Sequence, residues 1–190
     1  MVKPGVWAPG LRCHIYNTLS ELRLFPRSFY VSTQDIFSND WSDPVYFDFL
    51  GYDVDLFWDL NDDVYVTWSG INNATDKIYG IYQSKIDLEL ETGDSPTPAE
   101  KIFAGTLPNN SSARPEGPHV YLINGTYYLL IAEGTHNDYQ QFVSAQKAFL
   151  GGTDVHHRST IQRGPSPSGS WENDPANPIL FNGANLSLPV

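Results

Sequence analysis

Two acidic residues, Asp53 and Glu116, stand at positions from which a carboxyl group could exchange a proton with a bound molecule. Glu116 lies directly before a Gly-Pro corner in RPEGPHVYLINGTYYLLIAEG, and Asp53 opens a hairpin unit within GYDVDLFWDLNDDVYVTWSG. A side chain that must release a proton at one place needs a stiff mount of this kind. The alternative for Glu116 is an ordinary solvated carboxylate at the start of a strand, since most acidic residues lie on surfaces.

The segments around these residues predict β-hairpins. Residues 54–70 alternate into a strand, turn at Asn61-Asp62-Asp63 and return, and residues 119–133 repeat the scheme around an Asn-Gly turn. Residues 78–88 are a candidate for another strand pair, and residues 157–164 supply a further strand. Two regions depart from this pattern: residues 15–27 lack clean alternation, so a short helix or a distorted strand is expected there, and residues 137–156 interrupt a hairpin with an insert in which a short helix is considered.

The hairpins and the tryptophan-bearing turns that close them recur at a period of roughly 45 to 65 residues, the scale of propeller blades. We therefore predict an all-β fold, a partial β-propeller with about three blades. The alternative is a β-sandwich, whose strand spacing is similar. The length of 190 residues suits one domain, so residues 1–190 are expected to form a single partial catalytic domain.

Composition narrows the choice of ligand. The net charge of -11 argues against a nucleic-acid partner, because phosphate binding requires clustered Lys and Arg. No apolar run is long enough to span a membrane, so no membrane partner is expected. A neutral or cationic ligand fits better, and an oligosaccharide or polysaccharide is a neutral one. Cys13 is the single cysteine, which excludes an internal disulfide and predicts a buried or incidental thiol.

The sequence gives two conflicting indications of location. Its N-terminus, MVKPGVWAPG, has no signal-peptide core, whereas Asn-x-Ser/Thr sequons are frequent. A chain without its true N-terminus resolves the conflict, so an extracellular location is expected for the presumed full-length parent. The sequons begin at Asn73, Asn109, Asn110, Asn124 and Asn185.

Two carboxyl groups at the starts of successive hairpins suit glycoside hydrolysis. That reaction needs one carboxylic acid to protonate the leaving oxygen and a second carboxylate to activate water or attack the sugar. In a propeller the starts of these strands converge on the central axis. Asp53 and Glu116 are therefore expected at equivalent places in successive repeats, side by side and facing a sugar-sized hollow.

Four motifs in order carry a specific resemblance. WAPGLR, YDVDLFWDLNDDVYVTW, PEGPHVYLINGTYYLLIAEG and HRSTIQRGPSPSGSWENDPANPIL resemble family 43 glycoside hydrolases, which are five-bladed propeller β-xylosidases and α-L-arabinofuranosidases. The resemblance covers nearly the whole chain. It implies inverting hydrolysis of O-glycosyl bonds in xylan-derived oligosaccharides or arabinose side chains, that is, xylan degradation within carbohydrate metabolism. No cofactor and no metal ligand are identified in the sequence, and metal dependence stays open.

The resemblance also implies roles for individual residues. Glu116 matches the general acid, and Asp53 matches the aspartate that orients this acid and raises its pKa as a nearby like charge. The substrate-binding residues are Trp7, His119 and His157. The ring of Trp7 can stack on a sugar, with core packing as its alternative. For His119 and His157, the alternative to substrate binding is a structural role.

The chain departs from the family pattern in ways that affect the reaction. The family's general base is an aspartate in an Asn-Pro-Asp-Pro type motif before the WAP segment, and no such motif precedes Trp7. The general base is thus expected to be absent, as are the first and last blades. Val54 stands where the family has a proline. A non-catalytic carbohydrate-binding propeller fragment is the alternative function, and a related fold acting on fructans is a weaker one.

Overall fold

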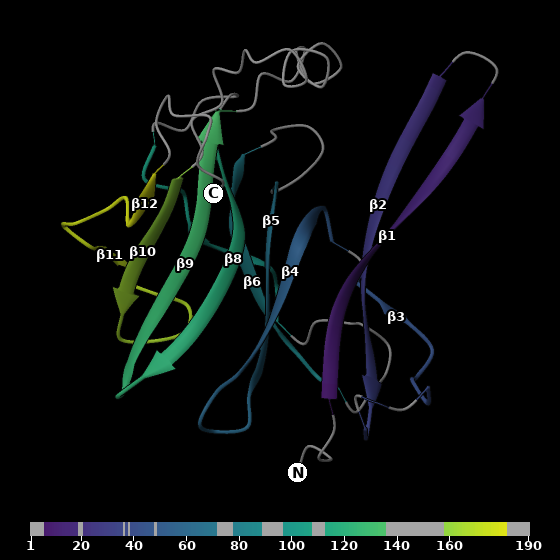
Figure 1. Cartoon of the computed structure of the whole chain (residues 1–190), viewed down its shortest axis with the longest axis horizontal. Helices are drawn as coiled ribbons and strands as arrows, with labels where there is room; N and C mark the ends of the chain where they lie inside the picture. The colour runs from purple at the N-terminus through teal and green to yellow at the C-terminus, as the bar shows by residue number, and fades with distance from the viewer. Residues whose placement is uncertain are drawn as a thin grey trace.

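The computed structural model is built from β-sheets. Within its described residues every regular element is a strand, and all pairings are antiparallel. The strands form three sheets that follow one another along the chain and lie side by side (Figure 1). In the same ranges no helix is long and apolar enough to cross a membrane. The described residues are 6–18, 21–35, 37, 39–47, 49–71, 78–88, 97–107, 113–135 and 158–181, so the insert at residues 137–156 lies outside them.

The first sheet is built on one long hairpin. Strand β1 (Val6–Thr18) pairs along its whole length with β2 (Glu21–Thr33), and the short β3 (Val45–Tyr46) pairs with the end of β2. The helix considered for residues 15–27 is therefore wrong, because the described part of that segment belongs to these two strands. Backbone pairing over the full length of the hairpin decides the structure there, although the side-chain pattern is irregular.

The second sheet has the order β4-β5-β6-β7. The predicted turn after β4 is confirmed: the Asp59 N–H donates to the Asp63 carbonyl at 2.9 Å, and Asp62 adopts a left-handed φ of 64°. Residues 78–88 form one strand and not the pair considered from the sequence. The bounds are β4 Gly51–Trp58, β5 Val64–Ile71, β6 Tyr79–Ile86 and β7 Glu100–Phe103.

The third sheet has the order β11-β10-β9-β8, with β12 paired to β10. The predicted Asn-Gly hairpin joins β8 to β9, and both turn residues have positive φ, 51° at Asn124 and 78° at Gly125. Two left-handed residues in succession match the right-handed twist of the flanking strands. The bounds are β8 Ala113–Ile123, β9 Thr126–Thr135, β10 Arg158–Gly164, β11 Glu172–Asn173 and β12 Leu180–Phe181.

The second sheet packs against the first sheet on one face and against the third sheet on the other, so the three sheets are stacked like the blades of a propeller. Along β5, side chains alternate between the two faces. Trp68 joins a buried cluster that includes Tyr30 and Phe47 of the first sheet, whereas Tyr65 packs on a cluster that includes Leu129 of the third. Sheets packed face to face in this way are the architecture of a propeller.

The first strands of the three sheets are neighbours. Strand β4 contacts β8 on one side and β1 on the other. Because Asp53 lies near the start of β4 and Glu116 near the start of β8, the stacking of the sheets brings the two acidic residues onto adjacent strands.

Candidate active site

Strands β4 and β8 carry the same irregularity at the same place. The pairing of β4 with β5 shifts between Tyr52 and Asp55, and the pairing of β8 with β9 shifts between Glu116 and His119. In each strand two residues then oppose a single residue of the partner, which is a β-bulge. Bulges bend a strand and redirect its side chains, so both strands change direction beside the acidic residues.

The sequence predicted that Asp53 and Glu116 occupy equivalent positions in β4 and β8, but the aligned bulges differ from that prediction by one residue. The first bulge residue is left-handed in both strands, Asp53 with a φ of 54° and Gly117 with a φ of 55°. Asp53 therefore corresponds to Gly117, and Glu116 corresponds to Tyr52. The two carboxyl groups lie on neighbouring strands as expected, but they do not occupy equivalent positions.

A ladder of hydrogen bonds joins the two strands. Each of its rungs connects residues that are 64 apart in the sequence, as expected for strands that run in the same direction in successive repeats. The rungs are Tyr52 Oη donating to Glu116 Oε1 at 2.5 Å, Gly117 N–H donating to Asp53 Oδ2 at 3.1 Å, and His119 Nδ1 to Asp55 Oδ1 at 3.2 Å.

The environment of Asp53 disfavours its charged form. Although its side chain keeps an exposed surface, the loss of hydration between β4 and β8 raises the pKa of its carboxyl. The Gly117 N–H lowers this pKa by hydrogen bonding, and the negative charge of Glu116 raises it again. The charges of Asp53 and Glu116 therefore interact across the two strands.

Tyr52 is tied to Glu116 by the shortest rung. Burial raises the pKa of the Tyr52 phenol, and the hydrogen bond to Glu116 and the charge of that carboxyl raise it further. The guanidinium of Arg114 opposes these effects. The phenol therefore keeps its proton and acts as a donor to Glu116 Oε1.

The third rung holds a histidine at the first paired position after the bulge of β8. The hydrogen bond to the Asp55 carboxylate raises the pKa of His119, burial lowers it, and the charges of Asp55 and Asp53 raise it. Asp55 Oδ2 also accepts the Val120 N–H at 3.2 Å. Asp55 thus binds both a side chain and the backbone of β8.

The structure places the residues predicted from the sequence as follows. Asp53 and Glu116 meet on adjacent strands, and His119 joins the same ladder through Asp55. Trp7 lies in β1 with its backbone opposite Ser32, while its side chain lies outside what the structure describes. His157 lies outside the described residues, so the substrate-binding roles of these two residues stay predictions.

Sequence reasoning missed Tyr52 and Asp55. Both flank Asp53 in the motif GYDVD, and nothing in their types distinguishes them from other strand residues. The signal that would have found them is the offset of 64 residues, because it pairs Tyr52 with Glu116 and Asp55 with His119 once the bulges are aligned.

A further buried carboxyl, Glu133, supports the strand next to Glu116. It lies opposite Pro115 in the β8–β9 pairing and is 1% exposed. Its oxygens accept hydrogen bonds from the Thr106 N–H at 2.6 Å, from the Thr106 hydroxyl at 2.5 Å and from the Thr160 hydroxyl at 3.2 Å. These bonds attach the segment after β7 to the third sheet.

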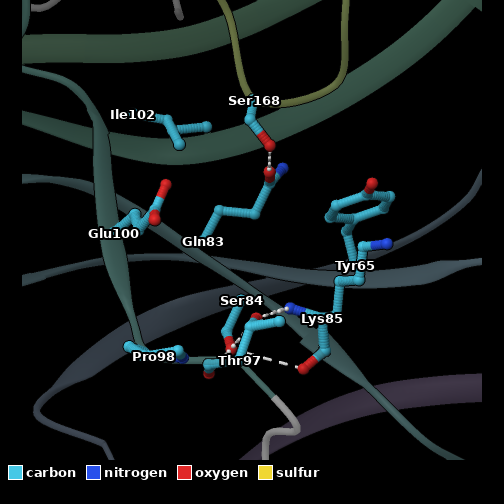
Figure 2. Close-up of a pocket in the computed structure, with 9 residues that line it drawn as sticks. All are labelled: Tyr65, Gln83, Ser84, Lys85, Thr97, Pro98, Glu100, Ile102 and Ser168. Atoms are coloured by element: carbon cyan, nitrogen blue, oxygen red, sulfur yellow. Dashed lines mark hydrogen bonds between the residues drawn. The ribbon is translucent and has the colours of Figure 1, made fainter.

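A small cavity of about 150 Å³ is lined mainly by residues of the second sheet, together with Ser168 from the segment after β10, and neither Asp53 nor Glu116 lines it (Figure 2). At its floor Gln83 donates to the Thr67 hydroxyl and to the Pro167 carbonyl, and it accepts from the Ser168 hydroxyl at 2.6 Å. These polar groups bond to one another, so the cavity is part of the contact between sheets. Across the described ranges, no group of three or more His, Cys, Asp and Glu could hold a metal ion.

The stacked sheets and the aligned first strands define a partial β-propeller. The sequence matches the glycosyl hydrolases family 43 over residues 2–188, and the protein belongs to that family. Similarity to a β-xylosidase of Bacillus subtilis (strain 168) is 28% identity over 98% of this chain and 32% of the relative. A non-reducing end α-L-arabinofuranosidase of Bacteroides ovatus is 28% identical over 94% of this chain and 29% of its own length.

A solved structure shows the same fold. The xylan β-1,4-xylosidase from Bacillus halodurans C-125 superposes with a TM-score of 0.70 at 23% identity, over 99% of this chain and 31% of that structure. The chain therefore spans about a third of the length of the relatives that it matches. The β-propeller predicted from the sequence, with part of its blades present, is confirmed.

Proposed function

We propose that the protein is an inverting glycoside hydrolase that cleaves O-glycosyl bonds in xylan-derived oligosaccharides or arabinose side chains. Residues 1–190 form a partial catalytic domain in this proposal. The observation that carries it is the hydrogen-bond ladder between β4 and β8. This ladder places Glu116 beside the carboxyl group of Asp53 and in a hydrogen bond with Tyr52. Membership of a glycoside hydrolase family supports a carbohydrate substrate.

Glu116 is the general acid in this proposal. Its carboxyl lies at a half-buried position just before a bulge, where the backbone cannot shift without breaking the pairing with β9. A proton on this carboxyl passes to the glycosidic oxygen as the bond to the sugar breaks. The water that attacks the sugar needs a general base, and the proposal assigns that role to no residue of this chain.

Asp53 is the residue that orients the acid. It accepts the N–H of Gly117, the peptide group directly after Glu116, and so fixes the backbone on which the acid stands. Its negative charge also opposes the ionisation of a neighbouring carboxyl. Trp7, His119 and His157 complete the proposal as substrate-binding residues.

The test compares leaving groups in the wild type and in Glu116→Gln. A general acid contributes about 10² to 10⁴ in rate, and this contribution is expected on xylobiose or a methyl arabinofuranoside, whose leaving oxygen needs a proton. A dinitrophenyl glycoside leaves without a proton, so its rate should fall far less. Proton NMR of the first product identifies the anomer and checks inversion.

The outcomes separate the enzyme from the binding module. Equal losses on both leaving groups would contradict the assignment of Glu116 as the acid. Absence of turnover by the wild type, together with saturable binding of xylo-oligosaccharides in calorimetry, would favour the carbohydrate-binding alternative. Glu172→Gln serves as the matched control, because it removes an exposed carboxylate that pairs with Arg163 elsewhere in the third sheet.

A further inference from the structure

We propose that Tyr52 is a positioning residue for Glu116, holding one oxygen of the carboxyl so that the other carries the proton. This inference rests on the proposed role of Glu116 and adds a residue to that site. The Tyr52 hydroxyl reaches Glu116 Oε1 at 2.5 Å across the contact between the second and third sheets.

The direction of this hydrogen bond determines which oxygen can act. The raised pKa of Tyr52 keeps the phenol protonated, so the hydroxyl donates and Oε1 accepts. A protonated Glu116 therefore carries its proton on Oε2, the oxygen that can deliver it. When the proton has left, the same hydroxyl stabilises the negative charge on the carboxylate, because hydrogen bonds to charged acceptors are the stronger ones.

The backbone holds both partners in place. Tyr52 is the last paired residue before the bulge of β4, and Glu116 is the last before the bulge of β8. In the next rung the Gly117 N–H donates to the Asp53 side chain, which fixes the peptide group that follows Glu116 in β8. The phenol and the carboxyl thus stand on ordered positions, as a positioning contact requires.

A cation, Arg114, also acts on the phenol of Tyr52. The charge of Arg114 lowers the pKa of Tyr52, which makes the hydroxyl a better hydrogen-bond donor than burial alone would leave it. Arg114 is itself held with its guanidinium 4.1 Å from the ring centroid of Tyr79. A cation at the face of an aromatic ring is a favourable contact that restricts the side chain.

The chain offers a matched control in Tyr127. Its hydroxyl donates to Asp59 Oδ1 at 2.6 Å, another tyrosine–carboxylate bond between the second and third sheets. The hydrogen bond to Asp59 raises the pKa of Tyr127 to about 12. Tyr127→Phe therefore removes a contact of the same chemistry that does not involve Glu116.

The first experiment needs no turnover. The protein is labelled with tyrosine carrying ¹³C at Cζ, the resonance of Tyr52 is identified by its loss in Tyr52→Phe, and its titration is followed with pH. In Glu116→Gln the pKa of Tyr52 should fall, because a charge and a charged acceptor are removed while burial remains. An unchanged titration of Tyr52 in Glu116→Gln would overturn the proposal.

The second experiment separates positioning from a structural role. Tyr52→Phe should lower kcat about 10- to 100-fold with little change in KM, the effect of losing one hydrogen bond to a charged group. The alkaline limb of its pH–rate profile should move to higher pH, since the ionised carboxyl loses a donor. Tyr127→Phe should keep the wild-type kcat and profile.

Equal kcat values for Tyr52→Phe and Tyr127→Phe, or an unmoved alkaline limb, would overturn the positioning role. If the wild type has no turnover at all, the proposed hydrolase function fails. The tyrosine titration still decides in that case whether Tyr52 controls the carboxyl of Glu116, so the two failures are distinguishable.

Discussion

The Gly117 N–H donates to Asp53 Oδ2 at 3.1 Å, and these two residues hold the same place in their strands. Both are left-handed, with φ values of 55° and 54°, at the first position of matching bulges. The peptide group just after the candidate acid is thereby fixed by the side chain of the neighbouring strand.

Replacement of Gly117 by alanine should destabilise the protein through its backbone alone. The added Cβ has room, since its nearest neighbour is the Cβ of Ala132 at 4.0 Å, but the left-handed φ costs about 1 to 2 kcal/mol for a residue with a Cβ. Gly125→Ala, in an open turn with a φ of 78°, should lose a similar free energy in urea unfolding. Only Gly117→Ala should also alter the titration of Tyr52. If Gly125→Ala altered the titration of Tyr52 to the same extent, the proposed connection between the Gly117 peptide and Tyr52 would be wrong.

Replacement of Asp53 by asparagine should change how stability depends on pH. The folded state raises the pKa of Asp53 above 3.8, so it holds a proton more tightly than the unfolded state does. Stability from this group is then present at low pH and lost as the pH rises from 3.8 through the folded pKa. Asparagine keeps an oxygen for Gly117 and tolerates a left-handed φ. Asp53→Asn should therefore gain stability relative to the wild type over that window, as melting temperatures would show. A relative loss over the same window would contradict the sign.

The contribution of the His119–Asp55 contact to stability should also depend on pH. Hydrogen bonding to Asp55 raises the pKa of the imidazole above 6.5, so its contribution to stability is full below 6.5 and is lost as the pH rises through the folded pKa. Asp55→Asn should move the pKa of His119 down towards 6.5 in an NMR titration of the ring protons. An unmoved titration would mean that Asp55 does not control the histidine.

Glu133 should matter for stability more than any exposed carboxylate. Glu133→Gln places an NH₂ group either where Oε1 accepts the Thr106 N–H or where Oε2 accepts the hydroxyls of Thr106 and Thr160, so about 1.5 to 3 kcal/mol of unfolding free energy should be lost. The exposed pair of Glu172 and Arg163 is the control, and Glu172→Gln should change stability by less than about 1 kcal/mol. Urea unfolding checks both values: the midpoint concentration should shift while the dependence of the unfolding free energy on urea concentration stays constant. Equal losses would mean that the buried bonds contribute little.

The amino-acid sequence by itself determined the hairpins and the acidic pair. Turn chemistry is local, so Asn124-Gly125 and the Asx-rich turn at Asp62 predicted their hairpins correctly. The order of four motifs likewise predicted the family, and the placement of Asp53 and Glu116 at the starts of successive hairpins predicted that they would meet.

Only the tertiary structure decided the register between the sheets. A bulge adds one residue to a strand without a distinctive sequence pattern, and it is this extra residue that aligns Glu116 with Tyr52 and Asp53 with Gly117. The burial of Glu133 was equally invisible, because its donors come from segments far away in the chain. Contacts between strands that are 64 residues apart depend on how sheets stack, and no local preference of the chain encodes that stacking.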